Sequence, residues 1–245
     1  MRFSTTKELD PISCFCQLVK KVYKHLNKKT SFSGLFQVKE DGSPVGDLDL
    51  EIQYIVRKEI AKLLPAFDLV SEESPIPDDL SGNCIVIDPV DGTENFVSGI
   101  PIWGTGMALF VDNVLVASWV YFPELELECR SRELREKMGI ENTEFRFPEQ
   151  VSRVHGYSSN SLWKEEALNF PEEVRIFGCS LFNLVLATKG AIAFRPSKKG
   201  ARVWDVAPAL LFALESGKKV MIDGKEYHGE FLDPSCRFVV EISPT

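Results

Sequence analysis

In several stretches of the chain, apolar side chains recur every three or four residues, which is the spacing of one helix face. We therefore predict helices over residues 8–27 and from Asp47 or Asp49 to the residue before Pro65. Three further helices are predicted at 161–169, 181–189 and 204–216, the last two closed by the glycines at 190 and 217.

Short apolar runs bounded by turn-forming residues predict strands. The uninterrupted run Ile85-Val86-Ile87 is typical of a buried strand, which we place at 84–87. Residues 105–111 and 114–122 predict a hairpin that turns at Asp112-Asn113. Asp41-Gly42-Ser43-Pro44 is a turn signal. The remaining predicted strands are 67–70, 151–156, 174–177, 191–194, 220–222 and 238–242.

This mixture of helices and strands predicts an α/β (α+β) fold. We place a soft boundary near residue 125, with an N-terminal part at 1–125 that carries most of the candidate site and a C-terminal part at 126–245. A chain of 245 residues is long enough to bury a substantial core. The net charge of −8 argues against nucleic acid or an anionic membrane surface as a partner.

The N-terminal residues and the cysteines bear on the compartment. The first seven residues, MRFSTTK, lack the apolar region of a secretory signal, and no apolar stretch approaches the roughly 20 residues of a membrane helix. Six cysteines are scattered without CxxC pairs, so neither a zinc site nor a disulfide framework is indicated. We therefore expect a cytoplasmic protein with free thiols.

Two aspartates, Asp88 and Asp91, follow the predicted strand at 84–87, where we expect a tight turn, and Gly92 and Thr93 come next. Packing the two carboxylates together without a cation would cost roughly several kcal/mol in repulsion and desolvation. Hard cations bind several oxygen ligands in a small volume and would remove that cost. The backbone amides around the glycine would then hold an anion such as phosphate. The segment therefore predicts a site for metal and phosphate.

Three more acidic residues, Asp49, Glu72 and Asp205, lie where predicted elements begin or end. Each side chain would project toward a shared cleft if these ends converge. The alternative for Asp49 and Asp205 is a helix N-cap, and Glu72 with Glu73 would alternatively be a solvated loop pair. By position alone, both interpretations stay open.

Three motifs in this order and spacing resemble those of the inositol monophosphatase superfamily. Asp88–Phe96, DPVDGTENF, resembles its first signature, and Trp204–Ala207, WDVA, resembles its second. Ser71–Ser74, SEES, resembles its Gly-Glu-Glu element. The resemblance covers roughly residues 10–220. It implies the layered αβαβα sandwich of the inositol monophosphatase and sugar phosphatase type.

The resemblance also implies a function. The chain would be a Mg²⁺-dependent phosphomonoesterase that hydrolyses a small polar phosphate ester by attack of metal-activated water, inositol monophosphate being the default substrate. Two or three Mg²⁺ ions would be bound by Glu72, Asp88, the Val90 carbonyl, Asp91 and Asp205. Family members are usually homodimers and often inhibited by lithium, so both properties are expected here.

Other roles are implied in the same way. Glu72, Thr93 and Asp49 would be catalytic, with the Thr93 hydroxyl near the attacking water and paired with Asp49. The residues expected to bind substrate are Asp91, Gly92, Thr93, Gly178, Cys179, Ser180 and Lys198. Cys179 is expected to be a packed side chain or, alternatively, a reactive thiol.

Departures from the family pattern leave the substrate open. Ser71 replaces the usual glycine, and Ser71-Glu72-Glu73 is more similar to the 3′(2′),5′-bisphosphate nucleotidases. Asn95-Phe96 is similar to inositol monophosphatases, whereas Gly99–Trp103 is similar to histidinol-phosphate phosphatases. Lys198 lies near the usual acidic substrate-binding position, and would meet a second phosphate or lie in a solvated loop.

A rival hypothesis is an inactive metal-binding regulator that senses a phosphorylated metabolite. The motifs argue against it, because every metal-binding carboxylate position is acidic and Thr93 is present.

Overall fold

The computed structural model describes residues 10–29, 36–38, 44–140, 154–157, 173–189, 193–195 and 200–243. Among these residues, no helix has the length and apolar character needed to cross a membrane.

A five-stranded mixed sheet forms the centre of the molecule, in the strand order β3-β4-β5-β6-β7. Strands β3 and β4 are parallel, and each later pair is antiparallel. The predicted hairpin is confirmed, because Asp112 and Asn113 turn the chain with φ of 50° and 65°. The strands are β3 (Asp68–Ser71), β4 (Cys84–Asp91), β5 (Gly104–Val111), β6 (Val114–Phe122) and β7 (Leu127–Arg130).

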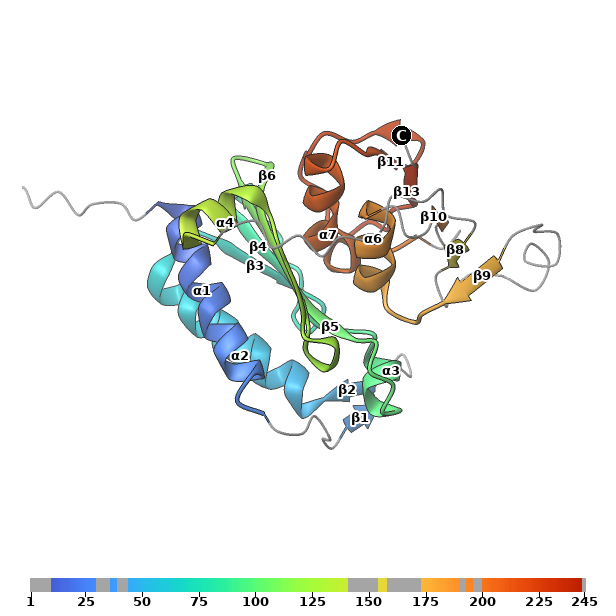
Figure 1. The fold of residues 1–245 in the computed structure, drawn as a ribbon. Coiled ribbons are helices and arrows are strands. Elements are labelled where there is room, and N and C mark those ends of the chain that lie inside the picture. Colours follow the sequence, from blue (N-terminus) through green and yellow to red (C-terminus); the bar gives the residue numbers. More distant parts are fainter. Residues whose placement is uncertain are drawn as a thin grey trace, which may run out of the picture.

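Both faces of this sheet are buried under helices, as Figure 1 shows. In β4, Ile85 and Ile87 face one hydrophobic core, whereas Cys84 and Val86 face the other, since successive strand residues point to opposite faces. The first core is closed by α1 (Pro11–Leu26), α2 (Asp47–Leu63) and α4 (Arg132–Met138). The second core is closed by α6 (Ser180–Thr188) and α7 (Val203–Glu215). Because both faces of β4 are buried, its run Ile85-Val86-Ile87 is entirely apolar.

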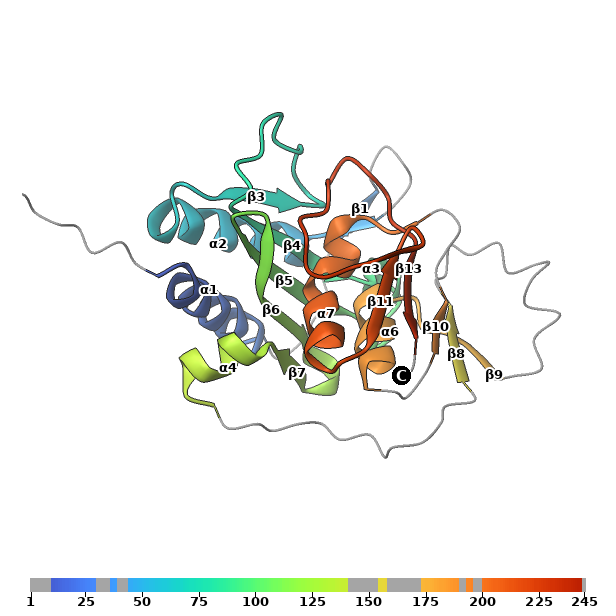
Figure 2. The ribbon, with the colours of Figure 1, turned by 90° about the horizontal axis from the view of Figure 1, so that it is seen from above.

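A six-stranded sheet lies beyond α6 and α7, in the order β12-β11-β13-β10-β8-β9 (Figure 2). The described residues thus form helix, sheet, helix and sheet layers, and the predicted mixed α/β fold is confirmed. The predicted helix at 161–169 lies outside them. The sheet contains β8 (Val154–Tyr157), β9 (Glu173–Ile176), β10 (Ala193–Arg195), β11 (Lys219–Ile222), β12 (Lys225–Glu226) and β13 (Val240–Ser243).

Smaller elements complete the described chain. A two-stranded ribbon of β1 (Phe36–Val38) and β2 (Pro44–Gly46) precedes α2. The predicted turn at 41–44 falls outside the described residues except for Pro44. A short helix, α3 (Thr93–Val97), follows β4, and a 3₁₀ turn, η1 (Pro123–Leu125), connects β6 to β7. The division near residue 125 stays a prediction; β7, which follows it, belongs to the central sheet.

The prediction that β4 ends before Asp88 is wrong. The strand continues through Asp91, with Asp88 opposite Gly106 and Asp91 opposite Gly104. Three steps on β4 therefore face two on β5, which is a β-bulge. A bulge turns side chains without ending the ladder, so the two aspartates lie within a paired strand rather than on a free turn.

Helix ends were predicted to within a few residues. The first helix begins at Pro11, not at residue 8, because Asp10 caps it by accepting from the Ile12 amide at 3.3 Å. Helix α7 ends at Glu215, and Gly217 adopts a φ of 69° as predicted for a closing glycine. Gly190 lies outside the described residues.

Candidate active site

Three acidic side chains from distant parts of the chain converge where β3, β4 and α7 meet. Glu72 follows β3, Asp88 lies in β4, and Asp205 lies in the first turn of α7. One carboxylate oxygen from each residue lies within 4.8 Å of the other two. The convergence expected from the sequence is therefore present for these three residues, and Glu72 does not belong to a separate solvated loop.

Asp91 is held against the start of α6. Its Oδ2 accepts from the Leu181 amide at 2.6 Å and from the Cys179 thiol at 2.8 Å, and its Oδ1 accepts from the Ser180 amide at 3.1 Å. Amides at a helix N-terminus stabilise a negative charge. Cys179 and Ser180, two of the residues expected to bind substrate, thus lie directly beside Asp91.

Asp205 and Asp49 take up the capping position three residues after the N-cap, not the N-cap itself. Asp205 Oδ2 accepts from the Arg202 amide at 2.7 Å, and Asp49 Oδ2 accepts from the Gly46 amide at 2.9 Å. The N-cap alternative is therefore wrong in position, although both carboxylates do cap their helices. Capping occupies one oxygen of Asp205 and fixes its carboxylate at the cluster.

The buried aspartates of this site, Asp88, Asp91 and Asp205, have raised pKa values. Desolvation, together with the charges of Glu72, Asp91, Asp205 and Asp49, holds the pKa of Asp88 well above its usual value. Desolvation and the neighbouring carboxylates raise the pKa of Asp205 to about 7. The pKa of Asp91 is raised to about 6, chiefly by desolvation, while the thiol of Cys179 and the α6 amides act in the opposite direction. Keeping these carboxylates ionised without a cation therefore costs free energy.

The donor set fits a hard divalent cation such as Mg²⁺. Asp88 is buried, and its Oδ1 accepts no hydrogen bond in the described structure. A buried carboxylate oxygen without a partner is costly unless something positive meets it. Oxygen ligands from carboxylates are those that Mg²⁺ prefers.

The segment after Asp91 requires glycine. Gly92 has a φ of 84°, and a Cβ there would lie 3.1 Å from both the Cys179 Cβ and the Ile102 carbonyl oxygen. Thr93 opens α3, and its hydroxyl donates to the Val90 carbonyl at 2.8 Å. The Val90 carbonyl keeps a second lone pair for a cation. Its role as a ligand and the pairing of Thr93 with Asp49 stay predictions.

The turn that contains Gly178 and Cys179 packs against Gly92 and Asn95. Gly178 has a φ of 74°, and a Cβ would lie 2.8 Å from the Asn95 Oδ1. The Cys179 thiol is buried, and desolvation and the charge of Asp91 raise its pKa well above the usual value. These surroundings favour the packed side chain over the reactive thiol. Lys198 lies outside the described residues.

Two polar side chains that contribute to this site were missed in the sequence. Asn95 donates through its Nδ2 to the carbonyls of Ile102 at 2.7 Å and Phe177 at 2.6 Å. These bonds connect α3 to the segment before β5 and to the segment before α6. Gln53 contacts the segment around Glu72. It follows Asp49 by four residues, and this polar i, i+4 pair within an apolar stripe was the available signal.

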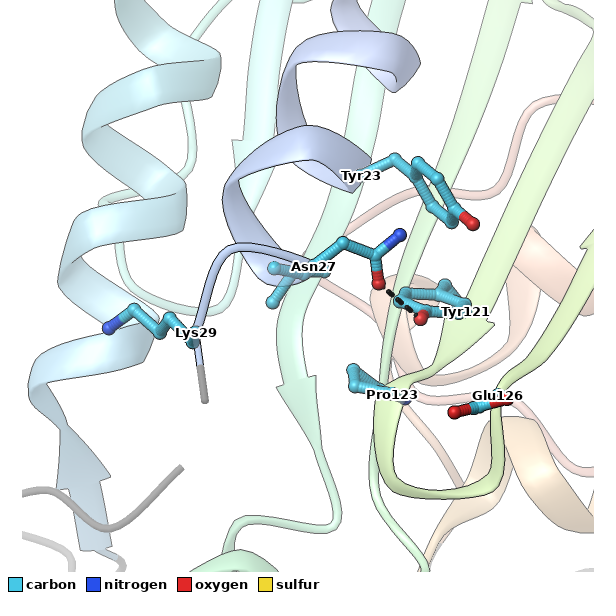
Figure 3. Close-up of a pocket in the computed structure, with 7 residues that line it drawn as sticks. Tyr23, Asn27, Lys29, Tyr121, Pro123 and Glu126 are labelled. Carbon is cyan, nitrogen blue, oxygen red and sulfur yellow. Dashed lines mark hydrogen bonds between the residues drawn. The ribbon is translucent and has the colours of Figure 1, made fainter. Parts of the chain in front are cut away.

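A separate hollow lies between the end of α1 and the turn after β6 (Figure 3). Its volume is about 430 Å³, and Tyr121 donates across it to Asn27 at 2.6 Å. None of the acidic residues described above lines this hollow. The lining residues are Tyr23, Leu26, Asn27, Lys29, Tyr121, Pro123 and Glu126.

Comparisons with known proteins identify the family that this chain resembles. The model of the inositol monophosphatase family matches residues 8–242. A histidinol-phosphatase of Mycobacterium tuberculosis is 26% identical over 202 residues, covering 76% of this chain and 77% of that protein. An inositol-1-monophosphatase of Mycobacterium bovis is 26% identical over 203 residues, covering 73% and 68%.

Solved structures share the fold. One of them, described as an IMPase/NADP phosphatase complexed with Mg²⁺ and phosphate, superposes with a TM-score of 0.69 at 18% identity, covering 95% of this chain and 88% of the other.

Proposed function

Because the chain belongs to the inositol monophosphatase family and is a phosphatase, we propose that it hydrolyses a small polar phosphate monoester in a Mg²⁺-dependent reaction. Inositol monophosphate is the default substrate. The observation that carries the proposal is the convergence of Glu72, Asp88 and Asp205 around a buried carboxylate oxygen that lacks a partner. We further propose two or three ions, inhibition by lithium, a homodimer and a cytoplasmic location.

The residues of the site have distinct roles in the proposed hydrolysis. Mg²⁺ held by Glu72, Asp88, Asp91 and Asp205 would lower the pKa of a water molecule and neutralise charge on the leaving oxygen. The water oxygen would form a bond to phosphorus and lose a proton while the ester P–O bond breaks, and the leaving alkoxide oxygen would take up a proton. Thr93, fixed by its bond to Val90, would orient the water, with Asp49 as its partner.

The phosphate would be bound by the backbone amides of Gly92 and Thr93. The left-handed conformation of Gly92 brings the start of α3 close to the turn at Gly178 and Cys179, where the leaving group would lie. The amides of Ser180 and Leu181 hold Asp91 between the proposed phosphate-binding segment and this turn. Asp91 would thus belong both to the proposed metal site and to the proposed substrate-binding region.

A substrate panel tests this proposal. We expect Mg²⁺-dependent phosphate release from inositol 1-phosphate, adenosine 3′,5′-bisphosphate and histidinol phosphate to be fastest with inositol 1-phosphate, and to fall when Li⁺ is added. Colorimetric phosphate determination with and without each ion provides the measurement. Binding of these esters without any release at millimolar Mg²⁺ would instead favour the inactive sensor.

A second candidate is a 3′(2′),5′-bisphosphate nucleotidase, and the positive charge of two arginines favours it. Arg202 donates to the Ser235 carbonyl at 2.8 Å, and Arg237 donates to the Gly200 carbonyl at 3.3 Å. Both arginines lie at the N-terminal end of α7, near Asp205. The Arg237 charge acts to lower the pKa of Asp205, which offsets part of the rise caused by desolvation. A second phosphate would be attracted to this side of the site.

The second candidate makes its own prediction. If the protein binds a second phosphate through its lysines at 198 and 199, Lys198→Ala with Lys199→Ala should raise the KM for adenosine 3′,5′-bisphosphate about tenfold, as expected for about 1.4 kcal/mol of lost binding. The KM for inositol 1-phosphate should stay unchanged. Arg237→Gln should act in the same direction. Equal effects on both substrates would exclude a subsite for the second phosphate.

A further inference from the structure

A buried polar pair links α2 to the segment that carries Glu72. Gln53 in α2 and Ser71 at the end of β3 are both buried. The Ser71 hydroxyl donates to the Gln53 Oε1 at 2.6 Å. The Gln53 Nε2 in turn donates to the Glu73 carbonyl at 2.7 Å. Both polar atoms of the Gln53 amide are therefore engaged, which leaves the side chain a single orientation.

The same pair holds the Glu73 backbone at two points. Besides the bond from Gln53 to its carbonyl, the Glu73 amide donates to the Ser71 hydroxyl at 3.3 Å. The chain on both sides of Glu72 is thus tied to one buried network. A rotation of the Glu72 backbone would break at least one of these bonds.

This network lies next to the acidic cluster. Ser71 is paired in parallel with Ile87, the residue before Asp88, so Glu72 leaves β3 beside Asp88. The α2 residue one turn before Gln53 is Asp49, which is buried in the same region. The two side chains therefore connect the rigid helix α2 to the loop that supplies a carboxylate to the cluster.

We propose that Gln53 and Ser71 are positioning residues that hold the Glu72 carboxylate in place for a divalent cation. This inference rests on the proposed metal-dependent function. Buried hydrogen bonds fix a side chain well only when every member is satisfied, and loss of one partner leaves the other desolvated without compensation. A glycine at position 71 would lack the hydroxyl and could not form this link.

The test measures binding of Mn²⁺ alone to the full chain, using the loss of the free Mn²⁺ signal in electron paramagnetic resonance. Gln53→Ala should weaken Mn²⁺ binding about 10- to 100-fold, the range found when residues that orient metal ligands are removed. Ser71→Ala should do the same, and it provides a second route if Gln53→Ala does not fold. Ser71→Thr, which keeps the hydroxyl, should restore most of the affinity.

Arg57→Ala is the matched control. Arg57 lies one turn after Gln53 on α2 and donates to the Ser74 hydroxyl at 2.7 Å, so it joins the same helix to the same loop. Its bond is exposed and does not involve the backbone around Glu72. We expect Arg57→Ala to leave Mn²⁺ affinity within about twofold of the wild type, since surface substitutions away from special features have small effects.

A double-variant comparison separates positioning from simple support of the fold. If Gln53 acts through Glu72, Gln53→Ala should have little further effect on Mn²⁺ binding in a Glu72→Gln background. Additive losses, or a lower melting temperature with unchanged Mn²⁺ affinity, would overturn the inference. Failure of the wild type itself to bind Mn²⁺ or release phosphate would overturn the proposed function instead.

Discussion

Asp88→Asn is expected to lower phosphate release by roughly 10³-fold or more, because several kcal/mol of charge stabilisation in the transition state depend on the cation it helps to bind. The Asp88 carboxylate is buried, and one of its oxygens lies within 4.8 Å of a carboxylate oxygen of Glu72 and of Asp205. The amide offers one weaker acceptor oxygen, so Mg²⁺ affinity should also fall. Turnover of the preferred ester, measured across a Mg²⁺ titration, tests this.

The same substitution should not unfold the protein. Desolvation and the surrounding carboxylates hold the pKa of Asp88 well above its usual value, so folding with this group ionised costs free energy. The neutral amide removes that cost, and the free energy of unfolding without metal should stay equal or rise. Asp78→Asn, at an exposed aspartate between β3 and β4, is the control and should leave turnover unchanged. Near-normal activity of Asp88→Asn would show the metal assignment to be wrong.

The second large effect concerns pH. The folded pKa values of Asp205 and Asp91, about 7 and about 6, lie above the value of 3.8 for an unperturbed aspartate. Between these limits the folded state binds more protons than the unfolded state, so the stability of the metal-free protein should fall as pH rises from about 4 to about 7. The Asp205 shift alone corresponds to about 4 kcal/mol as an upper estimate.

Chemical denaturation in the presence of a chelator, at pH 5 and pH 7.5, measures this decline. Asp205→Asn should flatten it, because the amide does not titrate and still offers an oxygen to the Arg202 amide. Addition of Mg²⁺ at pH 7.5 should restore stability by mass action, since the ion binds the folded cluster. A metal-free protein that becomes more stable from pH 5 to pH 7.5 would contradict the raised pKa values.

Local pattern was sufficient for the strand at 84–87, the hairpin at 105–122 and the second helix, because each is set by side chains within a few residues. The β4 extension was missed because the bulge depends on the partner strand. A Cβ at Gly106 would lie 2.4 Å from Leu181, and one at Gly104 would lie 2.6 Å from Phe122, so these glycines serve close packing that no local pattern reveals.

For the candidate site, the sequence by itself determined which residue types are available: the acidic residues 49, 72, 88, 91 and 205, and the glycine at 92 that permits a left-handed turn. Only the tertiary structure decided that Glu72, Asp88 and Asp205 meet, that Asp91 receives the amides of α6, and that Gln53 and Ser71 hold the Glu72 segment. The physical reason is the range of the interactions. Periodicity records contacts within one turn or one strand, whereas these contacts exist only after the helices pack on the two faces of the central sheet.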